Sequence, residues 1–208
     1  MNFDDRILEY KLENGRSVEK VMKNTENLFR KKYSRGKSEA PKETFNGNLI
    51  PGKVYIFDYF TDSKLSNKIE YINHMPLGLY CGAGKKLKDG TKIEFFIDFI
   101  VTPHLYRAEI LKKVFEYYQE VIDKNSNQIT SNQIPLDLRP KTIKKLLGGT
   151  GYSVSYTGFK RKFFRNIEVI DYSDWEAIPY INLDSVIGLR ISEIYKKYQM
   201  KLKADPRV

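Results

Sequence analysis

The stretch KIEFFIDFIV at residues 92–101 decides how the chain is expected to fold. It is rich in aromatic and β-branched residues, which is typical of a β-strand. Side chains alternate across a strand, so Ile93 and every second residue after it would face one side. Glu94 and Asp98 would point to the other side together with two apolar residues. The pattern predicts a strand that is buried on at least one face.

A helix is predicted directly after this strand. Thr102 can serve as its N-cap and Pro103 as its first residue. Apolar residues then recur at helical spacing as far as Ile122. We therefore expect a helix over residues 103–123 to pack on the strand and to form the main core with it.

Further strands are predicted on both sides of this unit. Residues Val54–Phe60 are β-branched and aromatic, and Asp58 within them would mark an exposed or edge position. Residues 69–80 predict one or two short strands interrupted at Pro76. The Asp89-Gly90 pair indicates a hairpin turn. Later strands are expected over 152–157 and 163–172, a turn or short helix at Trp175, and a last helix over 183–200.

The N-terminal part of the chain differs in pattern from the rest. Residues 17–33 predict an amphipathic helix capped by Ser17, and the polar stretch after it predicts a linker. The expected organisation is an N-terminal helix and extended arm over residues 1–46 and an α+β body over residues 47–208. The body would be a mainly antiparallel sheet packed by one or two amphipathic helices.

The composition narrows the function classes. The chain has 208 residues, a net charge of +10, one cysteine and two histidines. An intrachain disulfide and a cysteine-based zinc site are therefore excluded, and neither a signal peptide nor a membrane span is expected. Residues 141–208 hold 13 basic and 7 acidic residues, so more than half of the excess charge lies in the last third. Such a surface attracts phosphate backbones, anionic membranes or acidic proteins.

The densest basic cluster is GFKRKFFR at residues 158–165. Its four cations are interleaved with three phenylalanines, which suits binding of phosphates beside aromatic rings. A solvated edge strand protected by charge and a contact for an acidic protein explain the same pattern. A short basic helix is expected just upstream, over residues 141–147. The candidate contact residues for DNA or a partner are Lys160, Arg161, Lys162, Arg165, Lys141, Lys144 and Lys145.

Other candidate sites have simpler explanations. Gly148, Gly149 and Gly151 lack the lysine and the preceding strand of a phosphate loop, so they predict a helix end and a turn. Glu94, Asp98 and Asp58 could form a metal-dependent nuclease site, although solvent-facing strand residues are the more common explanation.

Three blocks together resemble small virion-associated proteins of tailed bacteriophages. They are PGKVYIFDY at 51–59, YINHMPL at 71–77 and YTGFKRKF at 156–163, the last followed by Asp174-Trp175. The resemblance covers roughly residues 50–180. The tight turn usual after the first strand is replaced here by TDSKLSNK, and residues 1–45 have no counterpart.

The resemblance implies a virion structural protein that is not an enzyme and needs no cofactor. We expect a head-to-tail connector, neck or tail ring component, assembled in the host cytoplasm. Its partners would be other virion proteins and copies of itself in a ring, with the N-terminal arm reaching a neighbour. The alternatives are a basic protein that coats or protects packaged DNA ends, and a metal-dependent nuclease.

Overall fold

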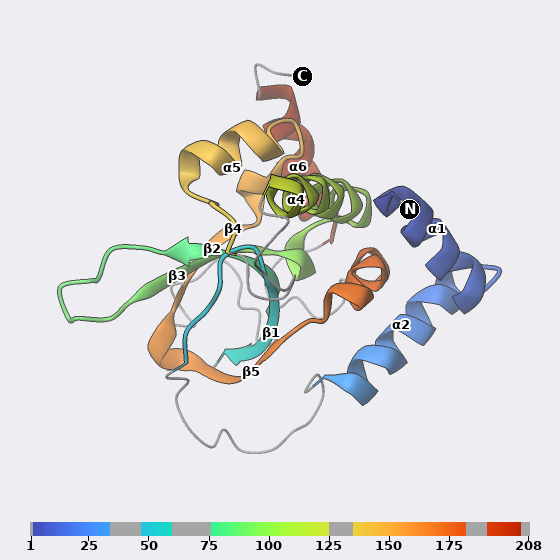
Figure 1. Ribbon diagram of the computed structural model, residues 1–208, viewed down its shortest axis with the longest axis horizontal. Coiled ribbons are helices and arrows are strands. Elements are labelled where there is room, and N and C mark those ends of the chain that lie inside the picture. Colours follow the sequence, from blue (N-terminus) through green and yellow to red (C-terminus); the bar gives the residue numbers. More distant parts are fainter. Residues whose placement is uncertain (1, 34–46, 60–75, 125–134, 182–190, 205–208) are drawn as a thin grey trace.

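A five-stranded antiparallel sheet forms the centre of the molecule (Figure 1). The computed structural model describes residues 2–33, 47–59, 76–124, 135–181 and 191–204. The sheet order is β4-β3-β2-β1-β5. Its strands are β1 (Val54–Tyr59), β2 (Leu77–Ala83), β3 (Ile93–Asp98), β4 (Tyr156–Lys160) and β5 (Phe164–Val169).

Helices cover one side of this sheet. They are α1 (Phe3–Asn14), α2 (Val18–Lys32), α4 (His104–Lys124), α5 (Pro140–Leu147) and α6 (Ile191–Ala204). Short 3-10 segments connect them to the strands, namely η1 (Phe99–Val101), η2 (Tyr152–Val154), η3 (Arg161–Phe163) and η4 (Tyr172–Tyr180). The expected α+β fold with a mainly antiparallel sheet and an N-terminal helix is confirmed.

The sheet is strongly curled. Strands β4 and β5 lie at opposite edges, yet only η3 separates them in the chain. Four spacings of about 4.8 Å would place the edges of a flat sheet about 19 Å apart, whereas the four steps from Lys160 to Phe164 reach about 14 Å at most. The Tyr59 hydroxyl accepts a hydrogen bond from the Lys160 amide at 3.1 Å, which draws β1 and β4 together. Register shifts in the β1–β5 and β2–β3 pairs increase the bend.

The curl separates two cores. The inner core, on the concave side of the sheet, consists of aromatic residues with a few partly buried aliphatic ones at its margin. Its buried members are Tyr55, Phe57, Tyr59, Tyr80, Phe96, Phe159, Phe163 and Phe164. The outer core lies between the opposite side of the sheet and the helices, and includes Ile97, Leu111 and Trp175. Strand β3 contributes to both cores because its side chains alternate.

The two N-terminal helices pack on the body of the same chain. Phe3 of α1 and Phe29 of α2 are fully buried in the outer core. The Phe3 ring lies 5.3 Å from that of Phe115 on α4. Helix α1 was not expected from the sequence, whereas α2 begins after Ser17, whose hydroxyl accepts a hydrogen bond from the Lys20 amide.

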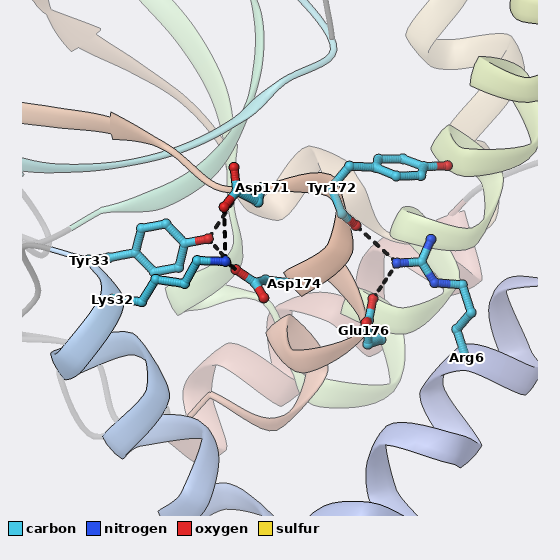
Figure 2. Close-up of polar contacts among 7 residues, drawn as sticks. All are labelled: Arg6, Lys32, Tyr33, Asp171, Tyr172, Asp174 and Glu176. Atoms are coloured by element: carbon cyan, nitrogen blue, oxygen red, sulfur yellow. Dashed lines mark hydrogen bonds and ion pairs between the residues drawn. The ribbon is translucent and has the colours of Figure 1, made fainter. Parts of the chain in front are cut away.

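Ion pairs fasten the same helices to η4 (Figure 2). The Arg6 guanidinium donates to the Glu176 carboxylate at 2.5 Å, and the Lys32 ammonium lies 2.6 Å from Asp174 and 2.9 Å from Asp171. The helical part of residues 1–46 is therefore held by its own chain. The boundary near residue 46 and most of the expected linker fall outside the described residues, so the division into arm and body stays a prediction.

Three carboxylates on the strands are buried, although the sequence predicted that they would face solvent. Asp58 lies on β1, which is flanked by β2 and β5 and so is not an edge strand; its exposed fraction is 8%. Glu94 and Asp98 are 1% and 0% exposed. The curl accounts for the burial of Glu94 and Asp98, which share the inner face of β3 with Phe96. Asp58 instead shares the outer face of β1 with Val54 and Ile56, which the helices cover.

Candidate polyanion-binding face

The hairpin between β2 and β3 carries four exposed lysines, Lys85, Lys86, Lys88 and Lys92. The predicted turn closes it: the Leu87 amide donates to the Thr91 carbonyl at 2.9 Å, and the Gly90 amide donates to the Leu87 carbonyl at 2.9 Å. Gly90 adopts a φ of 77°, a left-handed conformation that glycine accepts without strain. The hairpin extends to the left of the sheet in Figure 1, away from the helices.

The basic cluster of β4 and η3 lies beside this hairpin. Lys160 pairs with Ile93 across the β3–β4 ladder, and the Arg161 amide donates to the Lys92 carbonyl at 3.0 Å. The Lys162 ammonium lies 4.0 Å from the exposed Asp89 carboxylate at the hairpin tip. We call the set Lys86, Lys88, Lys92, Lys160 and Lys162 the basic face. Two segments about 70 residues apart in the sequence thus lie side by side and bring these lysines to the same end of the β3–β4 ladder.

Arg161 does not belong to this surface. Its guanidinium donates to Glu94 at 2.7 Å, and its side chain is only 18% exposed. The second oxygen of Glu94 accepts from the Tyr80 hydroxyl at 2.6 Å. Burial and the neighbouring carboxylate raise the pKa of Tyr80, so it stays protonated and able to donate. Arg161 therefore fixes η3 against the inner core.

Arg165 is likewise directed to the protein. Its guanidinium donates to the carbonyls of Lys162 at 2.9 Å and Phe164 at 2.7 Å. These bonds hold the turn from η3 into β5. Of the four cations predicted in this cluster, Lys160 is half-buried and Lys162 is exposed, whereas both arginines bind protein groups.

The other predicted cations lie on α5. Lys141, Lys144 and Lys145 are exposed, while Ile143 and Leu147 on the same helix are buried. A hollow of about 710 Å³ lies between the start of α5 and the β2–β3 hairpin, lined by residues of both. Pro140 is the α5 residue that lines this hollow, and Lys141 follows it directly in the sequence.

The carboxylates considered for a nuclease site are each engaged by protein groups. Glu94 holds Tyr80 and Arg161, the Asp98 carboxylate accepts from the Ile100 amide at 3.0 Å, and Asp58 accepts from the Asn166 side chain at 2.6 Å. Within the ranges that the structure describes, no group of three or more His, Cys, Asp or Glu residues could hold a metal ion.

The glycines after α5 adopt turn conformations. Gly149 and Gly151 have φ values of 81° and 66°, as expected for a helix end and turn. His74 lies outside the described residues. The ring of His104 contacts the Pro179 carbonyl at 2.6 Å and so links α4 to η4.

Sequence reasoning missed the hairpin lysines. The signal was present, because KKLKDGTK places four lysines around a predicted Asp-Gly turn. Residues 46–140 hold 12 basic and 11 acidic residues, and this near balance hid the local cluster.

No protein-family model, curated protein or solved structure matches the chain. Among the described residues, no helix is long and apolar enough to cross a membrane.

Proposed function

We propose that this chain is a non-enzymatic structural protein of a tailed-bacteriophage particle, a ring subunit of the neck or tail that contacts DNA through its basic face. The resemblance of residues 51–59, 71–77 and 156–163 to virion-associated proteins supports the placement in a particle. The basic face is the observation that supports the DNA contact.

The charge and shape of this face suit a phosphate backbone. Its five lysines come from the hairpin and from β4–η3, and Asp89 is the acidic residue found beside them. Lysines held close together repel one another, and an anionic partner relieves that repulsion. A two-stranded ribbon such as the β2–β3 hairpin also fits the major groove of B-DNA.

The salt dependence of DNA binding tests this proposal. Each phosphate neutralised by a cation contributes about 0.9 to the slope of log affinity against log salt concentration. We expect the quadruple variant of Lys86, Lys88, Lys92 and Lys162 to serine to reduce that slope by about 3–4. Fluorescence anisotropy with a labelled duplex, measured at several salt concentrations, gives the slope directly.

A matched variant controls for the loss of net charge. Lys20, Lys23, Lys31 and Lys201 are exposed on α2 and α6, away from the basic face. Their replacement by serine removes the same charge and should leave the slope nearly unchanged. Equal effects of the two variants would show that binding depends on total charge, and the assigned face would be wrong.

Incorporation into particles tests the structural role separately. A basic-face variant that folds and binds DNA normally but fails to join the particle would identify an acidic virion protein as the partner. Absence of the wild-type chain from purified particles would reject the virion role itself.

A further inference from the structure

Helix α1 carries two exposed leucines on its outward side. Its inner side contributes Phe3, Ile7 and Tyr10 to the outer core. On the opposite side Leu8 and Leu12 are 55% and 72% exposed, one helical turn apart. Leucines this exposed in pairs are unusual on a helix that already buries an apolar side.

Carboxylates surround these two leucines. Asp5, Glu9 and Glu13 are all exposed on α1. Arg6 on the same helix is engaged by Glu176, whereas Lys11 is half-exposed. We call Asp5, Leu8, Glu9, Leu12 and Glu13 the acidic leucine face.

The hollow between the β2–β3 hairpin and α5 has the complementary character. Most of its lining is apolar, and Leu87 at its rim is 40% exposed. Its volume of about 710 Å³ lies within the range of about 300–1,000 Å³ typical of sites that enclose a bound group. The other apolar lining residues are Pro51, Cys81, Ala83, Ile93, Phe95, Leu136, Leu138, Pro140 and Tyr156.

Cations border this hollow on two sides. Lys85 lines it from the hairpin, and the exposed Lys141 follows Pro140 at the start of α5. The charged pair inside it, Arg139 and Asp137, is joined by a bond of 2.7 Å and is neutral as a unit. An apolar segment flanked by carboxylates is therefore the partner that this surface fits best.

We infer that the acidic leucine face of one copy of this chain docks into the hollow of the next copy. The leucines would enter the apolar lining, and Glu9 and Glu13 would approach the bordering lysines. Helix α1 and the hairpin lie at opposite ends of the longest axis of the molecule (Figure 1). Two different surfaces at opposite ends make a head-to-tail contact, which generates a ring where the rotation closes.

This inference rests on the proposed role as a ring subunit and names the contact between its subunits. It leaves the DNA contact free, because Lys86, Lys88, Lys92 and Lys162 do not line the hollow. The two proposals therefore use different side chains and can fail separately.

Complementation between two variants tests the contact. One variant, Leu8→Ser with Leu12→Ser, removes the helix face; the other, Lys85→Glu with Leu87→Ser, alters the hollow. Sedimentation velocity without DNA should show concentration-dependent oligomers for the wild type. Each variant alone should associate at least about tenfold more weakly.

An equimolar mixture of the two variants gives the distinctive result. Each pair keeps one intact head-to-tail contact, so the mixture should form a complex of two chains and nothing larger. The control is Leu105→Ser with Met200→Ser, which replaces two residues of similar exposure on α4 and α6 and should assemble like the wild type. Circular dichroism establishes that each variant is folded.

Disulfide trapping provides a second test that does not depend on weakening the contact. A Leu12→Cys chain mixed with a Leu87→Cys chain should form a covalent dimer under mild oxidation, whereas Leu105→Cys with Leu87→Cys should not. Three outcomes would overturn the inference. The wild type could stay monomeric at about 100 µM, or the mixture of the two variants could form no complex. Alternatively, Leu105→Cys could be trapped with Leu87→Cys as readily as Leu12→Cys is. None of these outcomes affects the salt slope of DNA binding, which tests the basic face alone.

Discussion

Replacement of Glu94 by glutamine should strongly destabilise the fold. The Glu94 carboxylate is 1% exposed and accepts two charge-assisted hydrogen bonds, from Arg161 at 2.7 Å and Tyr80 at 2.6 Å. Glutamine keeps the size of the side chain but offers one acceptor oxygen and one amide group. Either Arg161 or Tyr80 would then face the NH2 group of the glutamine, which is itself a donor. The Arg161 guanidinium would also lose the negative charge that compensates it.

The magnitude follows from the burial of this pair. Removing one partner of a buried ion pair costs about 3–5 kcal/mol because the other charge is left without compensation. The Arg161 side chain retains 18% exposure, so water partly replaces the lost carboxylate. We therefore expect a loss of about 3 kcal/mol in the free energy of unfolding.

Urea denaturation followed by tryptophan fluorescence measures this loss. With a slope of about 2 kcal/mol per molar urea, the midpoint should fall by about 1.5 M. Arg161→Met should cost less in the Glu94→Gln background than in the wild type, since the pair is already broken. As a control, Asp89→Asn changes an exposed carboxylate and should leave the midpoint nearly unchanged. A loss for Glu94→Gln below about 1 kcal/mol would refute the reasoning, because it would mean that water reaches this pair.

Three further predictions concern the outer core and its surroundings. Phe115→Ala should cost about 3–5 kcal/mol in urea denaturation, because the ring packs 5.3 Å from Phe3 and 5.2 Å from Tyr172; a loss below about 1 kcal/mol would place it at the surface. Burial and nearby Arg107 lower the pKa of His104, so the unfolded chain binds more protons near pH 6. The His104 contribution to stability should therefore fall as the pH drops from about 7 to 5, and the difference between the wild type and His104→Gln across that range should show it. Burial raises the pKa of the Cys81 thiol, so a thiol reagent at pH 8 should label it slowly in the folded chain and rapidly in urea; equal rates would contradict its burial.

Local patterns in the sequence were sufficient for most individual elements. The alternation at residues 93–98 predicted β3, and the helical spacing after Pro103 predicted α4, because both periodicities are properties of a single segment. The cap at Ser17 and the turn at Asp89-Gly90 also depend on neighbouring residues alone. Helix α1 escaped prediction because two of its leucines face outward and blur the amphipathic pattern.

The site depended on contacts that no local pattern encodes. The sequence located the basic cluster of residues 158–165, but the pairing of β4 with β3 placed that cluster beside the hairpin lysines. The pairing of β5 with β1 curled the sheet, and the curl buried Glu94 and drew Arg161 away from the surface. Periodicity fixes which residues share a face of one segment, whereas strand pairing between distant segments decides which faces meet and which charges stay in water.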